Sequence, residues 1–237
     1  MRAVLLSSVF LAALPAYAGD LAIYGGAALG FTANGNNATK RDLSGYVEGE
    51  LSNFHLGVSA DIYNESNADE VGLSFGYRNT LDNGLAYDAS YTRQLYPNNG
   101  GDCCGYLDLN LRIPFGNVLT GEFDTSYHPN ASLADAHVSL EYLLDDKVTL
   151  SAKLGLAQNN GFRDTHEWEL SARYALGEAS AVSLHYYDAN NYKPFVGLDL
   201  TWDTTLFGGS GNPRDHNISG SDHKIMNLRP ILDKPGF

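Results

Sequence analysis

Short segments in which apolar and polar residues alternate one by one follow each other along almost the whole chain. Alternation with period two gives a β-strand one apolar and one polar face. So many strands must pack as two sheets or close into a barrel, because an open sheet leaves exposed edges. The predicted strands cover residues 20–33, 41–53, 54–64, 69–80, 84–96, 104–113, 116–128, 133–144, 147–157, 166–176, 180–188 and 193–206.

The alternation alone fits a soluble β-protein with an apolar core and a membrane barrel with an apolar outer face. In residues 104–113, for example, Leu107, Leu109, Leu111 and Ile113 oppose Asp108, Asn110 and Arg112. A soluble periplasmic sandwich or barrel is therefore the alternative to a membrane barrel. Three further features favour the membrane.

The first feature is residues 1–18, which resemble a secretory signal peptide. Arg2 supplies the basic start, residues 3–14 are apolar, and Ala16-Tyr17-Ala18 fits an A-x-A cleavage site.

The second feature is that shorter and longer connections between the predicted strands alternate strictly. Short periplasmic turns and longer extracellular loops give this alternation, and an even strand number returns both chain ends to the periplasm.

The third feature is the position of aromatic residues on the predicted outer face. Tyr77, Tyr142, Tyr174 and Trp202 fall near the periplasmic ends of strands, and Tyr127, Trp168 and Tyr186 fall near the extracellular ends. Amphipathic rings prefer the level of the lipid headgroups, so two such belts are typical of a membrane-spanning barrel.

The charge and the cysteine content exclude several classes of function. Asp and Glu outnumber Lys and Arg by 28 to 15, and this acidity argues against binding nucleic acid or an anionic membrane surface. The two cysteines, Cys103 and Cys104, are adjacent, so they cannot form a disulfide scaffold; a vicinal disulfide, a metal ligand pair and an incidental pair stay open.

Residues 43–157 resemble the TorF-like (Gcw_chp) family of proteobacterial outer-membrane porins. The resemblance lies in YVEGELSNFHLGVSADIYN, EVGLSFGYRNTLDNGLAYDASYTRQLYP and VSLEYLLDDKVTLSAKLG. The aromatic, Arg-containing opening of that family is replaced here by YGGAALGF. The resemblance implies a porin fold more than a defined mechanism, because porin activity is itself only presumed for the family.

The predicted polar faces carry twelve carboxylates and four basic side chains, which we expect to line the bore. Four bases cannot pair twelve acids one to one, so part of the bore should be wet and should favour cations. The alternative is a plugged barrel with internal ion pairs. The expected pore-lining residues are Glu48, Glu50, Asp61, Glu70, Arg78, Asp88, Asp108, Arg112, Glu122, Asp124, Glu141, Lys153, Glu169, Arg173, Asp199 and Asp203.

One polar triplet also fits catalysis. His137, Ser139 and Glu141 share one face of a predicted strand, as residues of a membrane-embedded lipid hydrolase would. Alternate residues on a strand lie about 7 Å apart, however, which exceeds the reach of a Ser–His hydrogen bond. No nucleophile motif surrounds them, and no metal-ligand spacing is present, so we expect no enzyme, cofactor or metal site.

The sequence thus predicts an all-β fold, an antiparallel transmembrane β-barrel of about twelve strands over residues 19–207. Residues 208–237 form a polar C-terminal tail whose composition allows disorder; it lies in the periplasm, enters the bore as a plug, or is an accident of the reading frame. We expect an outer-membrane, monomeric, cation-preferring porin-like channel for small solutes, with lipid and the barrel-assembly machinery as partners. A closed-bore structural or interaction protein and the hydrolase using His137 and Ser139 are the alternatives.

Overall fold

The computed structural model describes residues 21–34, 39–63, 69–98, 101–129, 133–158, 164–190 and 192–208. The predicted signal peptide, and the predicted tail beyond residue 208, lie outside these residues. All regular structure in the described ranges is β-strand, and no helix there is long and apolar enough to cross a membrane. The strands are β1 (Leu21–Asn34), β2 (Thr39–Leu51), β3 (Phe54–Tyr63), β4 (Glu70–Thr80), β5 (Ala86–Tyr96), β6 (Gly101–Phe115), β7 (Leu119–His128), β8 (Leu133–Leu143), β9 (Val148–Ala157), β10 (Thr165–Ala175), β11 (Ser180–Ala189) and β12 (Tyr192–Phe207).

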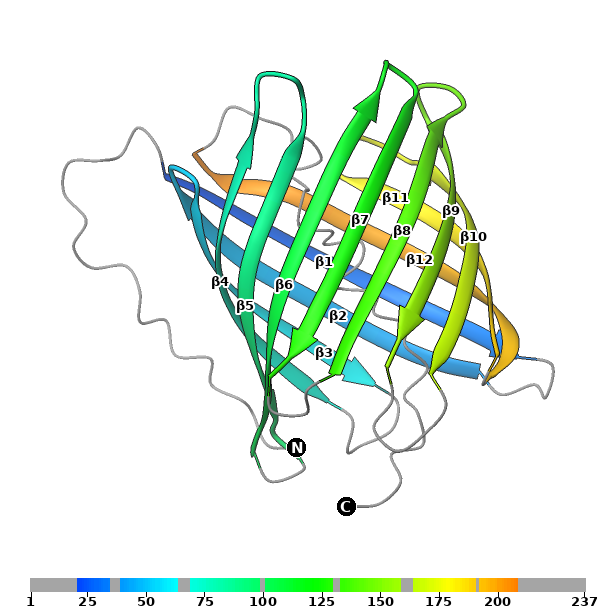
Figure 1. Cartoon of the computed structure of the whole chain (residues 1–237), viewed down its shortest axis with the longest axis horizontal. Helices are drawn as coiled ribbons and strands as arrows, with labels where there is room; N and C mark the ends of the chain where they lie inside the picture. Colours follow the sequence, from blue (N-terminus) through cyan, green and yellow to red (C-terminus); the bar gives the residue numbers. More distant parts are fainter. Residues whose placement is uncertain are drawn as a thin grey trace.

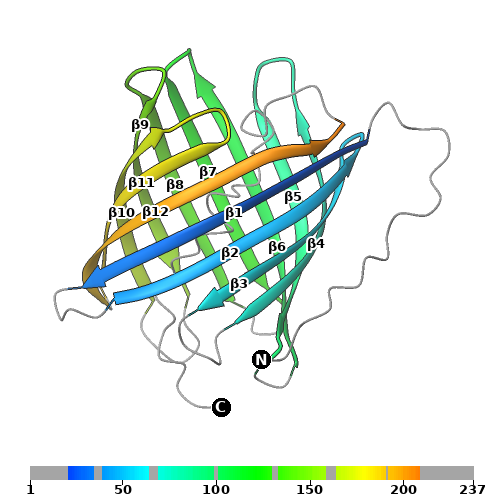
Figure 2. The same cartoon turned by 180° about the vertical axis from the view of Figure 1, so that it is seen from behind.

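The twelve strands form one closed antiparallel barrel. Each strand pairs with its neighbours in the sequence, and β1 pairs with β12 to close the ring. Figure 1 shows β5 to β9 in front of the strongly inclined β1, β2 and β12, and Figure 2, from behind, has β1, β2 and β12 in front. Closure leaves no free sheet edge, which is the requirement for a β-structure in lipid.

The barrel is apolar outside and polar inside, as a membrane-spanning barrel is. Leu154 on the outer face is 67% exposed, and Leu56 and Phe54 are each 66% exposed. On the inner face, Asp199 is 0% and Asp88 2% exposed. The fold class predicted from the alternation, a transmembrane antiparallel barrel of about twelve strands, is confirmed.

Aromatic side chains contact each other on the outer face near both rims. At the rim formed by the connections after even-numbered strands, Tyr77 packs edge-on against Phe54, with ring centroids 5.0 Å apart. At the opposite rim, Trp168 and Tyr186 lie 5.2 Å apart across β10 and β11. These pairs occupy the two levels at which the sequence predicts aromatic belts.

The connections alternate in length less regularly than the sequence predicts. The two longest, residues 64–69 and 158–164, do lie at the rim expected to carry longer loops. The connection between β11 and β12, at the same rim, spans only residues 190–191, because both strands extend into a segment predicted as loop. Two paired strands continue for as long as their backbones can form hydrogen bonds with each other. The polarity of the side chains does not reveal where this pairing ends.

Candidate functional site in the barrel interior

The structure places all the side chains predicted to line the bore on the inner face. Directly opposed residues of an antiparallel pair share a face, so the register assigns them. Asp61 opposes Glu70, Arg78 opposes Asp88, and Arg112 opposes Glu122. The remaining predicted residues share the same face through the other pairs: Glu48, Glu50, Asp108, Asp124, Glu141, Lys153, Glu169, Arg173, Asp199 and Asp203.

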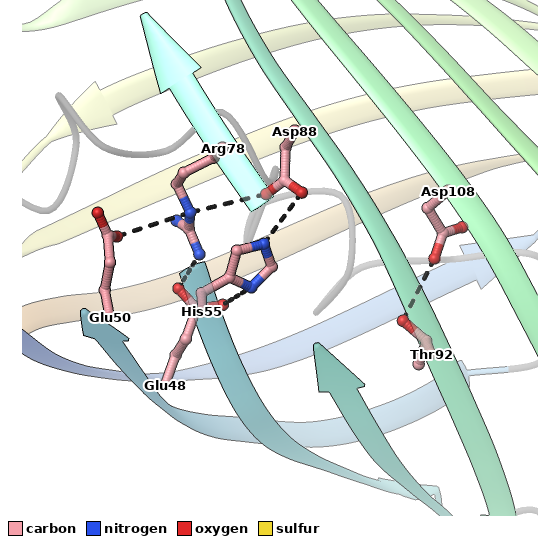
Figure 3. Close-up of polar contacts among 7 residues, drawn as sticks. All are labelled: Glu48, Glu50, His55, Arg78, Asp88, Thr92 and Asp108. Carbon is pink, nitrogen blue, oxygen red and sulfur yellow. Dashed lines mark hydrogen bonds and ion pairs between the residues drawn. The ribbon is translucent and has the colours of Figure 1, made fainter. Parts of the chain in front are cut away.

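A dense group of charges inside the barrel surrounds Arg78 and His55 (Figure 3). Arg78 forms an ion pair with Glu48, and its Nε lies 3.6 Å from Glu50 and 3.8 Å from Asp88. His55 contacts Glu48 through Nδ1 at 3.3 Å and Asp88 through Nε2 at 3.1 Å. The imidazole therefore lies between two carboxylates and is hydrogen-bonded to Asp88 through Nε2.

Arg78 and His55 show why counting acids against bases underestimates pairing in this interior. Arg78 faces three carboxylates at once, and two of them also face His55. The side chains of Arg78 and His55 are only 6% and 0% exposed. Such a cluster tolerates burial because its charges are paired and hydrogen-bonded. We call the part of the wall around Arg78 and His55, between β2 and β5, the dry wall, because these charged side chains are almost inaccessible to solvent.

Three contacts between strands that are not hydrogen-bonded to each other pass over a glycine. Gly76 opposes His55 on one side and Ser90, two residues from Asp88, on the other, and an ideal Cβ on Gly76 would sit 2.5 Å from His55 Nε2. Because glycine has no side chain, a residue on the strand before it can reach a residue on the strand after it. We call this arrangement a glycine-bridged pair.

In two further glycine-bridged pairs both partners directly oppose the glycine. His137 on β8 reaches Glu167 on β10 over Gly155, with Nε2 and Oε1 2.6 Å apart. On the other side of the barrel, the Tyr46 hydroxyl on β2 donates to Asp203 on β12 at 2.8 Å. The glycine that this contact passes over is on β1, at position 26. In all three pairs one partner donates a hydrogen bond and the other accepts it.

The wall formed by β6 to β8 is more accessible than the dry wall at its end next to the connections 116–118 and 144–147. Arg112 contacts Glu122 at 3.7 Å and Glu141 at 3.3 Å, and the side chains of Arg112 and Glu141 remain 33% and 30% exposed. Asp108 accepts hydrogen bonds from Ser126 at 2.5 Å and from Thr92 at 3.2 Å. Solvent therefore reaches charged groups at this end of β6 to β8.

The three arginines of the inner face lie at one end of the barrel axis, whereas carboxylates lie at both ends. Arg78, Arg112 and Arg173 lie within the last four residues of their strands, next to the connections 81–85, 116–118 and 176–179. Carboxylates dominate the opposite rim, where Asp61, Glu70, Asp135 and Glu167 lie within three residues of a strand end. We call this opposite rim, at the connections after odd-numbered strands, the acidic rim. It is the rim that the sequence predicts to be extracellular.

Sequence reasoning missed several interior charges. His55, Asp42, Asp135 and Glu167 all face inward, although none was expected in the bore. His55 is the second residue of β3, close to the turn at 52–53. The alternation is hardest to follow at such a strand start, so the face that His55 occupies was not recognised. The signal that could have found all four is strict alternation, extended to the first residues of each strand.

The arrangement of His137 and Ser139 does not fit a serine hydrolase. His137 is directed over Gly155 to Glu167, and the Ser139 hydroxyl is buried without a hydrogen-bond partner. Both residues face the interior, away from lipid. In the described ranges, no three His, Cys, Asp or Glu side chains are arranged to hold a metal ion. The side chains of Cys103 and Cys104 lie outside the described part of the structure.

Comparison with known proteins identifies relatives of the fold. No family model and no curated protein sequence matches the chain, so the TorF-like assignment stays a prediction. Among solved structures, the chain is similar to the KdgM porin, with a TM-score of 0.60 and 7% identity over 75% of this chain and 98% of that one.

A second porin and a ligand complex agree with this likeness. The NanC porin matches with a TM-score of 0.56 and 9% identity over 77% of this chain and all of that one (100%). KdgM in complex with disordered oligogalacturonate matches with a TM-score of 0.55 and 9% identity, covering 77% and 98% of the two chains. At such low identities the likeness shows that the chain has a porin fold, and the solute must be argued from its own residues.

Proposed function

We propose that this protein is an outer-membrane channel of porin type that lets small solutes diffuse passively. The observation that carries the proposal is the inverted polarity of a closed barrel, with exposed leucines outside and charged side chains inside. Only lipid makes such an outer face favourable, and an accessible charged inner wall suits water and polar solutes. Export by the signal peptide, insertion by the barrel-assembly machinery and a monomeric state belong to the same proposal, as does membership of the TorF-like family.

We further propose that the channel prefers cations. Carboxylates outnumber basic side chains on the inner face even when His55, His137 and His185 are counted as bases. The excess is greatest at the acidic rim, where a cation entering from outside the cell would arrive. Fixed negative charge lowers the energy of a cation and raises that of an anion along the path. Oligogalacturonate, the ligand in the KdgM complex, is an anion, so its charge is opposite to that of the solutes we propose for this channel.

Planar-bilayer recording of the refolded protein tests the channel and its preference separately. We expect single-channel steps and a reversal potential in a KCl gradient that favours K⁺ over Cl⁻. The preference should shrink between 0.1 M and 1 M salt, because the screening length falls from about 10 Å to about 3 Å. Current that favours Cl⁻ would refute the cation preference and leave the channel standing.

Variants on the accessible wall should connect the preference to the inner face. Glu141→Gln removes a carboxylate that is 30% exposed in its side chain and leaves Arg112 with one partner fewer. Glu178→Gln removes the same charge from the exposed connection 176–179 and is the matched control. Only Glu141→Gln should lower the ratio of K⁺ to Cl⁻ permeability. Equal ratios in both variants would contradict a path along this wall.

A closed-bore structural protein is the second candidate, and the dry wall around Arg78 and His55 favours it. Such a protein would give no current in any bilayer preparation while keeping the barrel fold. An enzymatic role is not part of the proposal, because the His137–Glu167 pair is directed away from Ser139 and from lipid.

A further inference from the structure

One arginine lies on the largely apolar outer face of the barrel. Arg93 on β5 directly opposes Leu73 on β4 and Gly105 on β6, and Leu73 is 44% exposed, so Arg93 shares the outer face with them. Among the outer-face strand residues whose side chains the structure describes, Arg93 is the only arginine or lysine. A cationic side chain on the lipid face is costly near the bilayer midplane but costs little near the headgroups. The depth of Arg93 in the membrane therefore decides what it can bind.

Arg93 lies as close to the acidic rim as the aromatic belt does. It precedes the end of β5, at Tyr96, by three residues. In the belt pair at this rim, Trp168 follows the start of β10 by three residues and Tyr186 precedes the end of β11 by three. Aromatic belts lie at the level of the lipid headgroups, so Arg93 is placed among headgroups and not among acyl chains.

A glycine holds a tyrosine hydroxyl beside Arg93. Gly105 has no side chain, and the Tyr91 phenol lies over it. An ideal Cβ on Gly105 would be 2.7 Å from the ring atoms Cε2 and Cζ of Tyr91, so a larger residue would displace the phenol. Phe75 on β4 packs against the same ring, with centroids 5.6 Å apart. The hydroxyl therefore lies over the residue that directly opposes Arg93 and supplies a second donor at this point of the wall.

Arg93 can serve a ligand in addition to its own chain. It has interactions within the chain, and one acid, Asp102, opposes Leu95 two residues further along β5. A guanidinium carries five N–H donors in a planar fork, so a contact within the chain leaves donors for another group. The geometry of the fork matches phosphate, which accepts two parallel N–H···O bonds from it.

We propose that Arg93 and Tyr91 bind the phosphate of a phosphorylated glycolipid of lipid A type in the outer leaflet. Phe75 and Leu107, 59% and 49% exposed and two residues closer to the midplane, would contact the acyl chains of the same lipid. Free phosphate lacks these apolar contacts, so the surface favours the lipid. The net acidity of the chain argues against adsorption on an anionic surface, whereas one guanidinium in the wall binds one headgroup. The assignment rests on the proposed outer-membrane location, in which the acidic rim is extracellular.

Lipid titration of the refolded protein in detergent tests the binding without requiring a current. Bound lipid is counted by native mass spectrometry, with bisphosphorylated lipid A, the same lipid without phosphates, and inorganic phosphate as probes. We expect the phosphorylated lipid to half-saturate the protein at a concentration about tenfold lower than the dephosphorylated lipid, because charge-assisted hydrogen bonds are strong. Inorganic phosphate at equal concentration should not displace the lipid. Equal affinities of the two lipids, or displacement by inorganic phosphate, would overturn the proposal.

Four variants assign the preference to this site. Arg93→Gln should abolish the preference for the phosphorylated lipid, whereas Lys147→Gln, which removes the same charge from the exposed connection 144–147 at the other rim, should retain it. Tyr91→Phe removes only the hydroxyl and should weaken binding of the phosphorylated lipid about fivefold. Asp102→Asn should retain the preference, because the lipid and not this acid is the partner proposed for Arg93. A preference that survives Arg93→Gln, or that Lys147→Gln or Asp102→Asn abolishes as well, would refute the assignment.

Two other measurements separate this proposal from the proposed function. A protein that prefers the phosphorylated lipid but gives no current in bilayers retains the site and loses the channel. A protein that conducts but binds both lipids equally retains the channel and loses the site. Whole-cell labelling that places the acidic rim in the periplasm would remove the outer-leaflet lipid as occupant and overturn the proposal.

Discussion

Replacing Gly155 by alanine tests whether glycine is what allows charged side chains two strands apart to meet. An added Cβ would lie 2.3 Å from His137 Cδ2 and 2.7 Å from Glu167 Cγ, so the contact between the two cannot persist unchanged. A hydrogen bond to a charged group contributes about 1.5–3 kcal/mol. Alanine in a strand recovers about 0.5–1 kcal/mol relative to glycine. We therefore expect a net loss of about 1–2 kcal/mol.

The assay is reversible denaturant unfolding of the barrel in lipid vesicles, followed by tryptophan fluorescence. Gly49→Ala is the matched control, because Gly49 is also a strand residue but an added Cβ there meets nothing within 4 Å. The loss should also shrink when His137→Ala removes the pair beforehand, as a double-mutant cycle would show. If Gly155→Ala costs no more than Gly49→Ala, or costs the same in the His137→Ala background, the reasoning is refuted.

Three further predictions address the dry wall, the outer face and the orientation. Arg78→Ala should destabilise the barrel by about 3–5 kcal/mol in the same assay, because it leaves buried carboxylates unpaired; a loss below that of Gly155→Ala would contradict this. Leu154→Arg, on the outer face, should cost about 2–4 kcal/mol near the bilayer midplane, whereas Ser151→Arg, on the inner face, should cost less; the reverse order would exclude the assigned faces. In a variant without native cysteines, a cysteine at Asp164 should react with an impermeant reagent on whole cells and one at Asp146 should not; reversed labelling would place the acidic rim in the periplasm.

Much of the architecture could be predicted from the sequence because a barrel wall is one residue thick. Each side chain faces either lipid or the interior, so period-two alternation fixes both the strand and its faces. That is why inner-face residues as far apart as Glu48 and Asp203 were predicted on the same face before any pairing was known. Strand ends were less predictable, as residues 190–191 show, because ladders extend until the backbone turns.

The interactions within the site could not be predicted in the same way. Alternation places His137 and Glu167 on the inner face but gives no reason to join them, since they lie on strands that are not neighbours. The pairing depends on the register of three strands and on a glycine at the crossing point. Histidine adds a second difficulty, because its charge depends on which groups face its two nitrogens, and sequence alone does not supply them.

The glycine-bridged contact between Tyr46 and Asp203 has a consequence for how the barrel is built. It joins β2 to β12 across β1, so it cannot form while the sheet is still open, however many strands have already paired. His55 likewise waits for Asp88 until β5 has joined β4. Interior charged groups therefore lack these partners until the next strand has paired. The Tyr46–Asp203 contact, the last of them, forms only when β1 is paired with both β2 and β12. Loss of the tyrosine hydroxyl should weaken this closure while leaving the hairpins that precede it intact.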